Sequence, residues 1–172
     1  MTSYRAPLDE TETDDLLLAA YRLASQKLLG SGVDVWSNSW GPSLWPFSLQ
    51  DYQQAYLDVS RSVAEQGREG LGVVTLFAAG NARTERFDTA DNVTDAMPWS
   101  IAVAASDQKG GLTSYSTPGA ALLITAPGSD PRTIVTTDRS GSDGYNTAPG
   151  EAGNYTNTDE SYFNGTSSAT PT

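Results

Sequence analysis

The stretch Leu71-Gly72-Val73-Val74-Thr75-Leu76-Phe77-Ala78-Ala79-Gly80-Asn81 decides the fold. Its apolar residues run from 71 to 79 without alternation, which is typical of a strand buried on both faces of a parallel sheet. Gly80 and Asn81 end the run with residues that favour turns. The stretch therefore predicts a central strand over residues 71–79, with a turn at its carboxyl end.

Helices and strands alternate on the amino-terminal side of this strand. Residues 14–29 place apolar side chains at helical spacing after an acidic start, and a Gly-Ser-Gly run predicts the end of that helix. Residues 33–39 predict a strand, and residues 48–66 carry a second apolar helical face that Gly67 closes. The order helix, strand, helix, strand predicts an α/β fold of three layers, a mostly parallel sheet with helices on both faces.

The carboxyl-terminal half predicts shorter elements. After an acidic loop over residues 83–95, strands are expected at residues 99–104, 121–126 and 133–136. Residues 138–163 are rich in Gly, Asn, Asp, Ser and Tyr without periodicity, so they predict a surface loop. Residues 1–12 are polar and acidic, and we expect them to be irregular. No repeat or linker divides the chain, so residues 1–172 predict one domain or part of one.

Composition restricts the partners of the chain. Its 172 residues carry 21 acidic and 10 basic side chains, a net charge of −11, which argues against binding to nucleic acid or to an anionic membrane. This charge fits either a solvated acidic surface or attraction of basic substrates. The chain has no cysteine and therefore no disulfide. No apolar run reaches the roughly 18 residues that span a bilayer, and the first residues lack the apolar core of an export signal.

Polar residues follow two of the predicted strands. Ser39-Trp40-Gly41 follows the first and Gly80-Asn81 follows the second. Ligands of open α/β sheets bind beyond the carboxyl ends of strands, so a site is expected there. A third candidate is Asn164-Gly165-Thr166-Ser167-Ser168-Ala169-Thr170-Pro171, which puts a serine between a glycine turn and small residues where a chain enters a buried helix.

Ser167 is therefore a candidate nucleophile. A serine hydroxyl attacks when a base removes its proton and when hydrogen-bond donors stabilise the oxyanion. The side-chain amide of Asn81 is a candidate donor, but the chain contains no histidine to act as the base. The residues supply half of a hydrolase site.

Three motifs together resemble those of the subtilisin-like serine proteases, and within them the kexin and proprotein-convertase branch. Ser39-Trp40-Gly41-Pro42 resembles the substrate-binding segment, and Ala78-Ala79-Gly80-Asn81 resembles the strand end that delivers the oxyanion-hole asparagine. The serine segment described above resembles the nucleophile motif. Residues 134–138, Ile-Val-Thr-Thr-Asp, are also similar to a segment of that branch. The resemblance covers residues 13–171.

The resemblance implies a serine-type endopeptidase that cleaves peptide bonds through an acyl-enzyme intermediate. Ser167 would be the nucleophile, and Asn81 would bind the oxyanion together with the Ser167 backbone N–H. Ser39-Trp40-Gly41 would form one wall of a cleft and pair with an extended peptide as an added strand. Ala78-Ala79-Gly80 would line the other side. A prosegment and an extracellular or periplasmic location are also implied.

The chain departs from the family pattern in its catalytic residues. The family's aspartate stands in an Asp-Thr-Gly or Asp-Ser-Gly context and its histidine in His-Gly-Thr, and neither context occurs here. We therefore expect a partial subtilisin-like peptidase domain, an internal fragment truncated at both ends and inactive alone.

Specificity and metal binding stay open. Counting from Asn81 places Asn92 where convertases carry the aspartate that selects arginine or lysine, and a one-residue shift would place Asp91 there. Relatives bind structural calcium through acidic side chains, but Leu44 and Thr117 stand where two convertase ligands would be expected. We name no metal ligand, and the chemistry itself requires no cofactor.

Two other interpretations stay open. A non-catalytic relative would keep the cleft as a subtilase-like peptide-binding module after loss of its histidine or aspartate. A complete small α/β protein with an acidic binding surface would unfold cooperatively as residues 1–172 alone.

Overall fold

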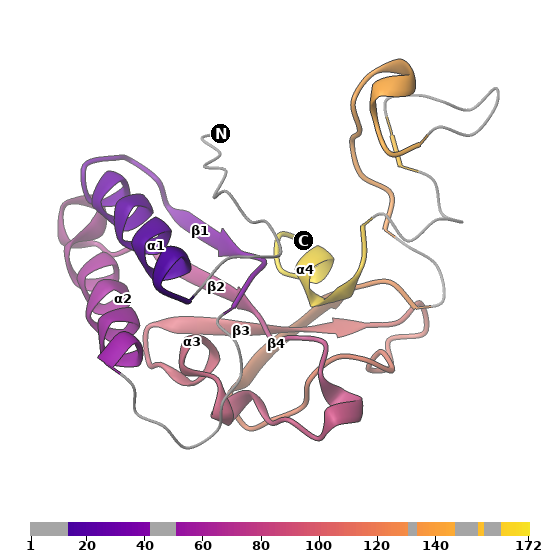
Figure 1. Cartoon of the computed structure of the whole chain (residues 1–172), viewed down its shortest axis with the longest axis horizontal. Coiled ribbons are helices and arrows are strands. Elements are labelled where there is room, and N and C mark those ends of the chain that lie inside the picture. Colours follow the sequence, from indigo (N-terminus) through magenta and orange to yellow (C-terminus); the bar gives the residue numbers. More distant parts are fainter. Residues whose placement is uncertain (1–13, 42–50, 131–133, 147–154, 157–162) are drawn as a thin grey trace.

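Four parallel strands form the centre of the structure. The computed structural model describes residues 14–41, 51–130, 134–146, 155–156 and 163–172. Within them, the strands pair in the order of the chain, and every pairing is parallel: β1 (Val35–Asn38), β2 (Val74–Ala78), β3 (Ser100–Ser106) and β4 (Leu122–Pro127). The predicted α/β fold class is confirmed (Figure 1).

Helices cover both faces of this sheet. The α-helices of the described residues are α1 (Asp14–Leu29), α2 (Asp51–Gly70), α3 (Val93–Ala96) and α4 (Gly165–Ala169). The first two pack against each other and against the sheet face that carries Phe77. Leu76 points to the opposite face because consecutive strand residues alternate, and it packs against the cluster that contains Ala169 of α4. Figure 1 shows α4, in yellow, apart from the α1–α2 pair.

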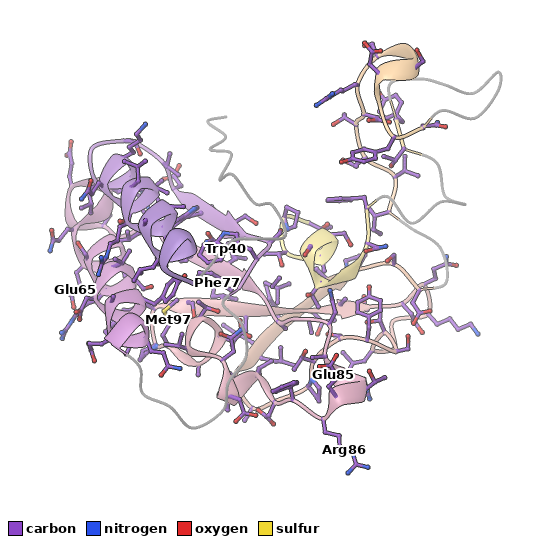
Figure 2. All side chains as sticks on the ribbon, in the orientation of Figure 1. Trp40, Glu65, Phe77, Glu85, Arg86 and Met97 are labelled. Carbon is purple, nitrogen blue, oxygen red and sulfur yellow. The ribbon has the colours of Figure 1, made fainter. Side chains whose placement is uncertain are left out.

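An aromatic cluster joins α1 and α2 to the sheet. Tyr21 stacks on Trp36 with ring centroids 4.6 Å apart, and it meets the edge of Trp40 at 5.5 Å. Phe77 and Met97 belong to the same cluster, and Figure 2 shows their side chains beside that of Trp40. Aromatic pairs of this kind add stability beyond the area that they bury. The cluster fixes α1 and α2 against the strands that end at the predicted site.

The connection from α2 to β2 differs from the prediction. Helical dihedral angles stop before Gly67, as the sequence indicated, because the angles from Gly67 to Glu69 are not helical. The strand, however, begins at Val74 and not at residue 71. Gly72 adopts a φ of 81°, and a Cβ there would collide with the Ala64 carbonyl oxygen. The first part of the apolar run therefore turns the chain out of the helix.

The acidic loop predicted over residues 83–95 is wrong, because that segment contains short helices. They are η1 (Arg83–Glu85), η2 (Thr89–Asp91) and α3, and a further short helix, η3 (Gly141–Asp143), forms later in the chain. Side chains start two of them: Asp88 accepts the Ala90 N–H at 2.8 Å, and Asn92 accepts the Thr94 N–H at 3.1 Å. Helices of three or four residues are too short to show a helical period in sequence.

The strand predicted at residues 133–136 is also wrong for its described residues, which belong to no strand of the sheet. The Thr136 carbonyl accepts the Thr156 N–H at 2.9 Å, and Thr137 forms an isolated antiparallel bridge with Tyr155. Residues 136–137 therefore pair with residues 155–156 and not with the sheet. Figure 1 shows this part of the chain projecting from the sheet. Its β-forming residues favour pairing but do not specify the partner.

The face of the sheet that carries α4 is only partly covered. Ala105 and Val103 are buried in the cluster with α4. Val35, Val74 and Ile124 lie on the same face, because they alternate or pair with its residues, and they are 54%, 44% and 44% exposed. The described residues of α4 therefore cover only part of this face.

Some predictions concern residues outside the described part of the chain. They include the irregular structure expected of residues 1–12, the roles considered for Pro42 and Leu44, and most of the predicted loop beyond residue 146. Within the part that the structure describes, no helix combines the length and the hydrophobicity needed to cross a membrane.

Candidate active site

Three segments meet at the carboxyl edge of the sheet. Ser39 directly follows β1, Asn81 follows β2 after two residues, and Ser167 lies in α4. Parallel strands end at the same edge, which brings the first two segments together, and hydrogen bonds join α4 to both. The structure thus brings together the residues predicted as cleft wall, oxyanion donor and nucleophile.

Thr166 holds the side chain of Asn81. Asn81 Oδ1 accepts the Thr166 N–H at 2.9 Å and the Thr166 hydroxyl at 3.1 Å. The same Thr166 Oγ1 accepts the Gly80 N–H at 3.1 Å. These donors fix which end of the amide faces Thr166, and no described residue accepts a hydrogen bond from Asn81 Nδ2. The amide nitrogen is therefore an oriented donor with two hydrogens to give.

Two glycines allow close approaches around the end of β2. Gly165 has a φ of 76°, and a Cβ there would lie 2.9 Å from Asn81 Nδ2. Gly80 has a φ of 86°, and a Cβ there would lie 3.1 Å from Thr117 Oγ1. Glycine adopts these angles without steric cost. A side chain at Gly165 would displace the Asn81 amide.

Ser39 and Ser167 exchange hydrogen bonds. The Ser167 hydroxyl donates to the Ser39 carbonyl at 3.1 Å, and the Ser39 hydroxyl donates to the Ser167 carbonyl at 2.8 Å. Ser167 is half-buried and Ser39 is exposed, so the Ser167 hydroxyl lies at an accessible edge. The chain has no histidine, so no imidazole of these residues takes its proton.

The other predicted cleft residues differ in exposure. Trp40 is half-buried and packs edge-on against Phe77, with ring centroids 5.5 Å apart. Ala78 and Ala79 are 7% and 3% exposed, whereas Gly80 is half-buried and Gly41 is exposed. The alanine and tryptophan side chains therefore belong mainly to the interior, and the surface is formed by Ser39 and the glycines.

Asn92 lies directly behind Gly41. A Cβ at Gly41 would be 3.4 Å from Asn92 Nδ2, and that nitrogen donates to Asp95 Oδ2 at 3.1 Å. Asp95 is 3% exposed, and its Oδ1 has no hydrogen-bond partner in the described structure. Burial raises the pKa of the Asp95 carboxyl to about 7, although the hydrogen bond from Asn92 lowers it. The buried Asp95 carboxyl is therefore separated from Gly41 of the predicted cleft wall by the Asn92 side chain.

The described residues offer no metal centre. They contain no cluster of three or more Asp, Glu, His or Cys side chains that could hold an ion. Asp91 caps a helix, with its carboxylate accepting the Asp88 N–H at 3.2 Å. Thr117 is buried and its hydroxyl accepts the Ala82 N–H at 3.0 Å.

Comparison with protein families identifies the group to which this geometry belongs. A family model described as the Subtilase family matches residues 1–172. The chain belongs to the subtilase family. The resemblance found in the motifs is confirmed at this level, whereas the kexin-like branch and the fragment interpretation stay predictions.

Curated and solved relatives of this subtilase agree with that family. Proteins named "Calcium-dependent protease" from Nostoc sp. and Trichormus variabilis are each 37% identical over 163 residues, which cover 82% of this chain. The chain spans only 23% of the length of either relative.

Solved structures show the same fold. The Aeromonas sobria serine protease in complex with its chaperone matches with a TM-score of 0.71 at 22% identity, over 95% of this chain and 32% of that one. A cold-adapted subtilisin-like serine proteinase matches with a TM-score of 0.58 at 21% identity, over 94% of this chain and 45% of that one. At this identity the likeness concerns the fold.

Two residues at this subtilase site were not predicted from the sequence. Thr166 stands inside the quoted serine segment, and its position beside a candidate nucleophile was the available signal. Asp95 lies in the predicted acidic loop, and nothing in the sequence marks it as buried. Both depend on contacts with residues far along the chain or on burial under other elements.

Proposed function

We propose that the chain forms part of the peptidase domain of a serine-type endopeptidase, with Ser167 as its nucleophile. Family membership and the protease relatives support a serine protease. The observation that carries the proposal is the orientation of Asn81. Thr166 occupies Asn81 Oδ1 with two donors, which leaves the Nδ2 hydrogens beside Gly165, two residues before the serine.

The chemistry follows from these groups. Ser167 Oγ attacks the substrate carbonyl carbon, and the resulting oxyanion accepts hydrogen bonds from Asn81 Nδ2 and from the Ser167 N–H. That N–H lies in the first turn of α4, where backbone donors have no partner within a helix. Collapse of this intermediate expels the amine and leaves an acyl-enzyme, which water hydrolyses.

The proton acceptor must come from elsewhere. Residues 1–172 contain no histidine, so we infer that a longer protein supplies the histidine and the aspartate of a triad. The length of the curated relatives, of which this chain spans 23%, supports that inference. When a base takes the Ser167 proton, the hydroxyl gives up its bond to the Ser39 carbonyl.

The proposed substrate is a protein or peptide bound as an extended strand along residues 39–41. Ser39 and Gly41 are exposed there and offer backbone groups for pairing. The other side of the cleft is assigned to the backbone of Ala78-Ala79-Gly80. Asn92 lies behind Gly41 and is already hydrogen-bonded, so basic specificity of the kexin-like type rests on the motifs and on the net charge of −11.

Calcium is not assigned to this chain. The relatives are named for calcium dependence, and calcium prefers several oxygen ligands. The described residues contain no cluster of three or more acidic side chains that could supply such ligands. The Aeromonas sobria protease was solved with a chaperone, and a prosegment or similar folding partner belongs to the proposal, as does export from the cell.

Fluorophosphonate labelling of the full-length protein tests the nucleophile. We expect Ser167→Ala to abolish labelling. Ser168→Ala is the matched control, because the Ser168 hydroxyl is buried and donates to the Gly165 carbonyl at 2.9 Å. Labelling that persists in Ser167→Ala contradicts the assignment. A wild-type protein that binds peptides but takes no label would favour the non-catalytic peptide-binding module.

Peptide hydrolysis by Asn81→Ala tests the donor. We expect kcat to fall with little change in KM, because the donor acts on the transition state. Loss of the corresponding donor in a subtilisin, a member of the same family, costs about 2.7–4 kcal/mol. A variant with raised KM and unchanged kcat would show that Asn81 serves substrate binding instead.

A further inference from the structure

The shorter of the two hydrogen bonds between Ser39 and Ser167 comes from the Ser39 side chain. Ser39 Oγ donates to the Ser167 carbonyl at 2.8 Å, across 128 residues of sequence. Ser39 is exposed, so water competes with the Ser167 carbonyl for this hydroxyl. The Ser167 carbonyl thus accepts a hydrogen bond from an exposed side chain of a distant segment.

Pro171 leaves the Ser167 carbonyl without a backbone donor. In an α-helix each carbonyl accepts the N–H four residues later, and the residue four after Ser167 is Pro171, which has no N–H. The carbonyls on either side are satisfied: Thr166 accepts the Thr170 N–H at 3.0 Å, and Ser168 accepts the Thr172 hydroxyl at 2.9 Å.

We propose that the Ser39 hydroxyl is a positioning group that replaces the missing N–H of Pro171 and holds the backbone of Ser167. This inference rests on the proposed function. The Ser167 N–H and Oγ are attached to the backbone that this bond holds, so the bond sets their placement relative to Asn81. When a base engages Ser167, the bond from Ser167 Oγ is lost, and the bond from Ser39 Oγ stays.

The pairing can be tested by moving the donor from one residue to another. Thr170 keeps right-handed helical angles, φ −59° and ψ −41°, so the backbone N–H of an alanine at position 171 would point toward the Ser167 carbonyl. Pro171→Ala should therefore compensate for loss of the Ser39 hydroxyl.

The experiment uses the full-length protease with four variants: Ser39→Ala, Ser39→Thr, Pro171→Ala, and the double variant of Ser39→Ala with Pro171→Ala. One net hydrogen bond predicts that Ser39→Ala lowers kcat and the rate of fluorophosphonate labelling by about 3- to 10-fold, with KM changed less. Ser39→Thr keeps a hydroxyl and should retain most of the rate. The double variant should regain most of what Ser39→Ala loses.

The outcomes separate this inference from the proposed function. If the wild type is labelled at Ser167 but Ser39→Ala reacts as fast, the positioning role is overturned and the nucleophile stands. Equal losses in Ser39→Ala and Ser39→Thr, or no recovery in the double variant, also overturn it, because the donor would then not be what matters. If the wild type takes no label at Ser167, both proposals fail. A change in thermal midpoint alone, at unchanged labelling rate, shows a structural bond and overturns the positioning role.

Discussion

Replacing Asp95 by asparagine should change how the stability of the fold depends on pH. Asp95 is 3% exposed, and its Oδ2 accepts a hydrogen bond from Asn92 at 3.1 Å while its Oδ1 has no partner in the described structure. A buried carboxylate without full hydrogen bonding is costly, so the neutral acid is favoured. Asparagine keeps the shape and an acceptor oxygen, and it carries no charge at any pH.

The magnitude follows from the pKa. Burial raises the pKa of Asp95 from 3.8 to about 7, and each pKa unit corresponds to about 1.4 kcal/mol. Ionising Asp95 in the fold therefore costs on the order of 4 kcal/mol. Between these two pKa values the native state holds a proton that the unfolded state releases, so the free energy of unfolding falls as pH rises. The stability is fully present below about pH 4 and is lost as pH rises through about 7.

Urea unfolding of the full-length protein, followed by tryptophan fluorescence between pH 4 and pH 8, measures this effect. The difference in unfolding free energy between wild type and Asp95→Asn should shift by several kcal/mol in favour of the variant as pH rises. Asp58→Asn, which removes an exposed aspartate on α2, controls for the loss of one negative charge. A difference between wild type and Asp95→Asn that stays constant with pH would refute the reasoning.

Three further substitutions test other contacts. Thr166→Val removes the hydroxyl bonded to Gly80 and Asn81, so it should lose about 1–3 kcal/mol in urea unfolding, whereas Thr166→Ser should lose less than 1 kcal/mol; equal losses would contradict this. Gly165→Ala puts a Cβ 2.9 Å from Asn81 Nδ2, so kcat should fall at least about tenfold, and an unchanged kcat in hydrolysis assays would argue against the oxyanion role. Tyr21→Phe removes a 2.8 Å bond to a buried serine and should lower the unfolding free energy by about 0.5–1.5 kcal/mol; an unchanged midpoint would show that the bond contributes nothing.

The long periodic elements were predictable from sequence. The helix predicted over residues 14–29 has those bounds in the structure, because its apolar spacing extends over four turns and glycine follows it. The strands at β3 and β4 were predicted within two residues at each end. A run of apolar β-formers between turn residues fixes such strands locally. The parallel order follows from the alternation of helices and strands.

The wrong or missing predictions concern segments whose structure depends on contacts with residues far away in the sequence. Residues 71–73 look like strand, yet Gly72 takes a positive φ against the Ala64 carbonyl because the chain must turn out of α2 there. Residues 134–136 were predicted as a strand of the sheet, but Ile134 and Thr136 are hydrogen-bonded to Phe163 and Thr156 instead. At the site, the sequence named Ser167 and Asn81, but it could not show that Thr166 holds the amide. That contact depends on two segments 85 residues apart.

The candidate site and the stability of α4 depend on the same bonds. Three contacts hold the described residues of α4, Gly165–Ala169. Thr166 ties it to the end of β2, Ser39 ties it to the end of β1, and Ala169 packs on the cluster of β3. Because the bonds that hold α4 also orient Asn81 and Ser167, a substitution that loosens the helix should misplace the donor and the nucleophile together. The rate of labelling should therefore respond to these anchors even where no anchor touches the substrate.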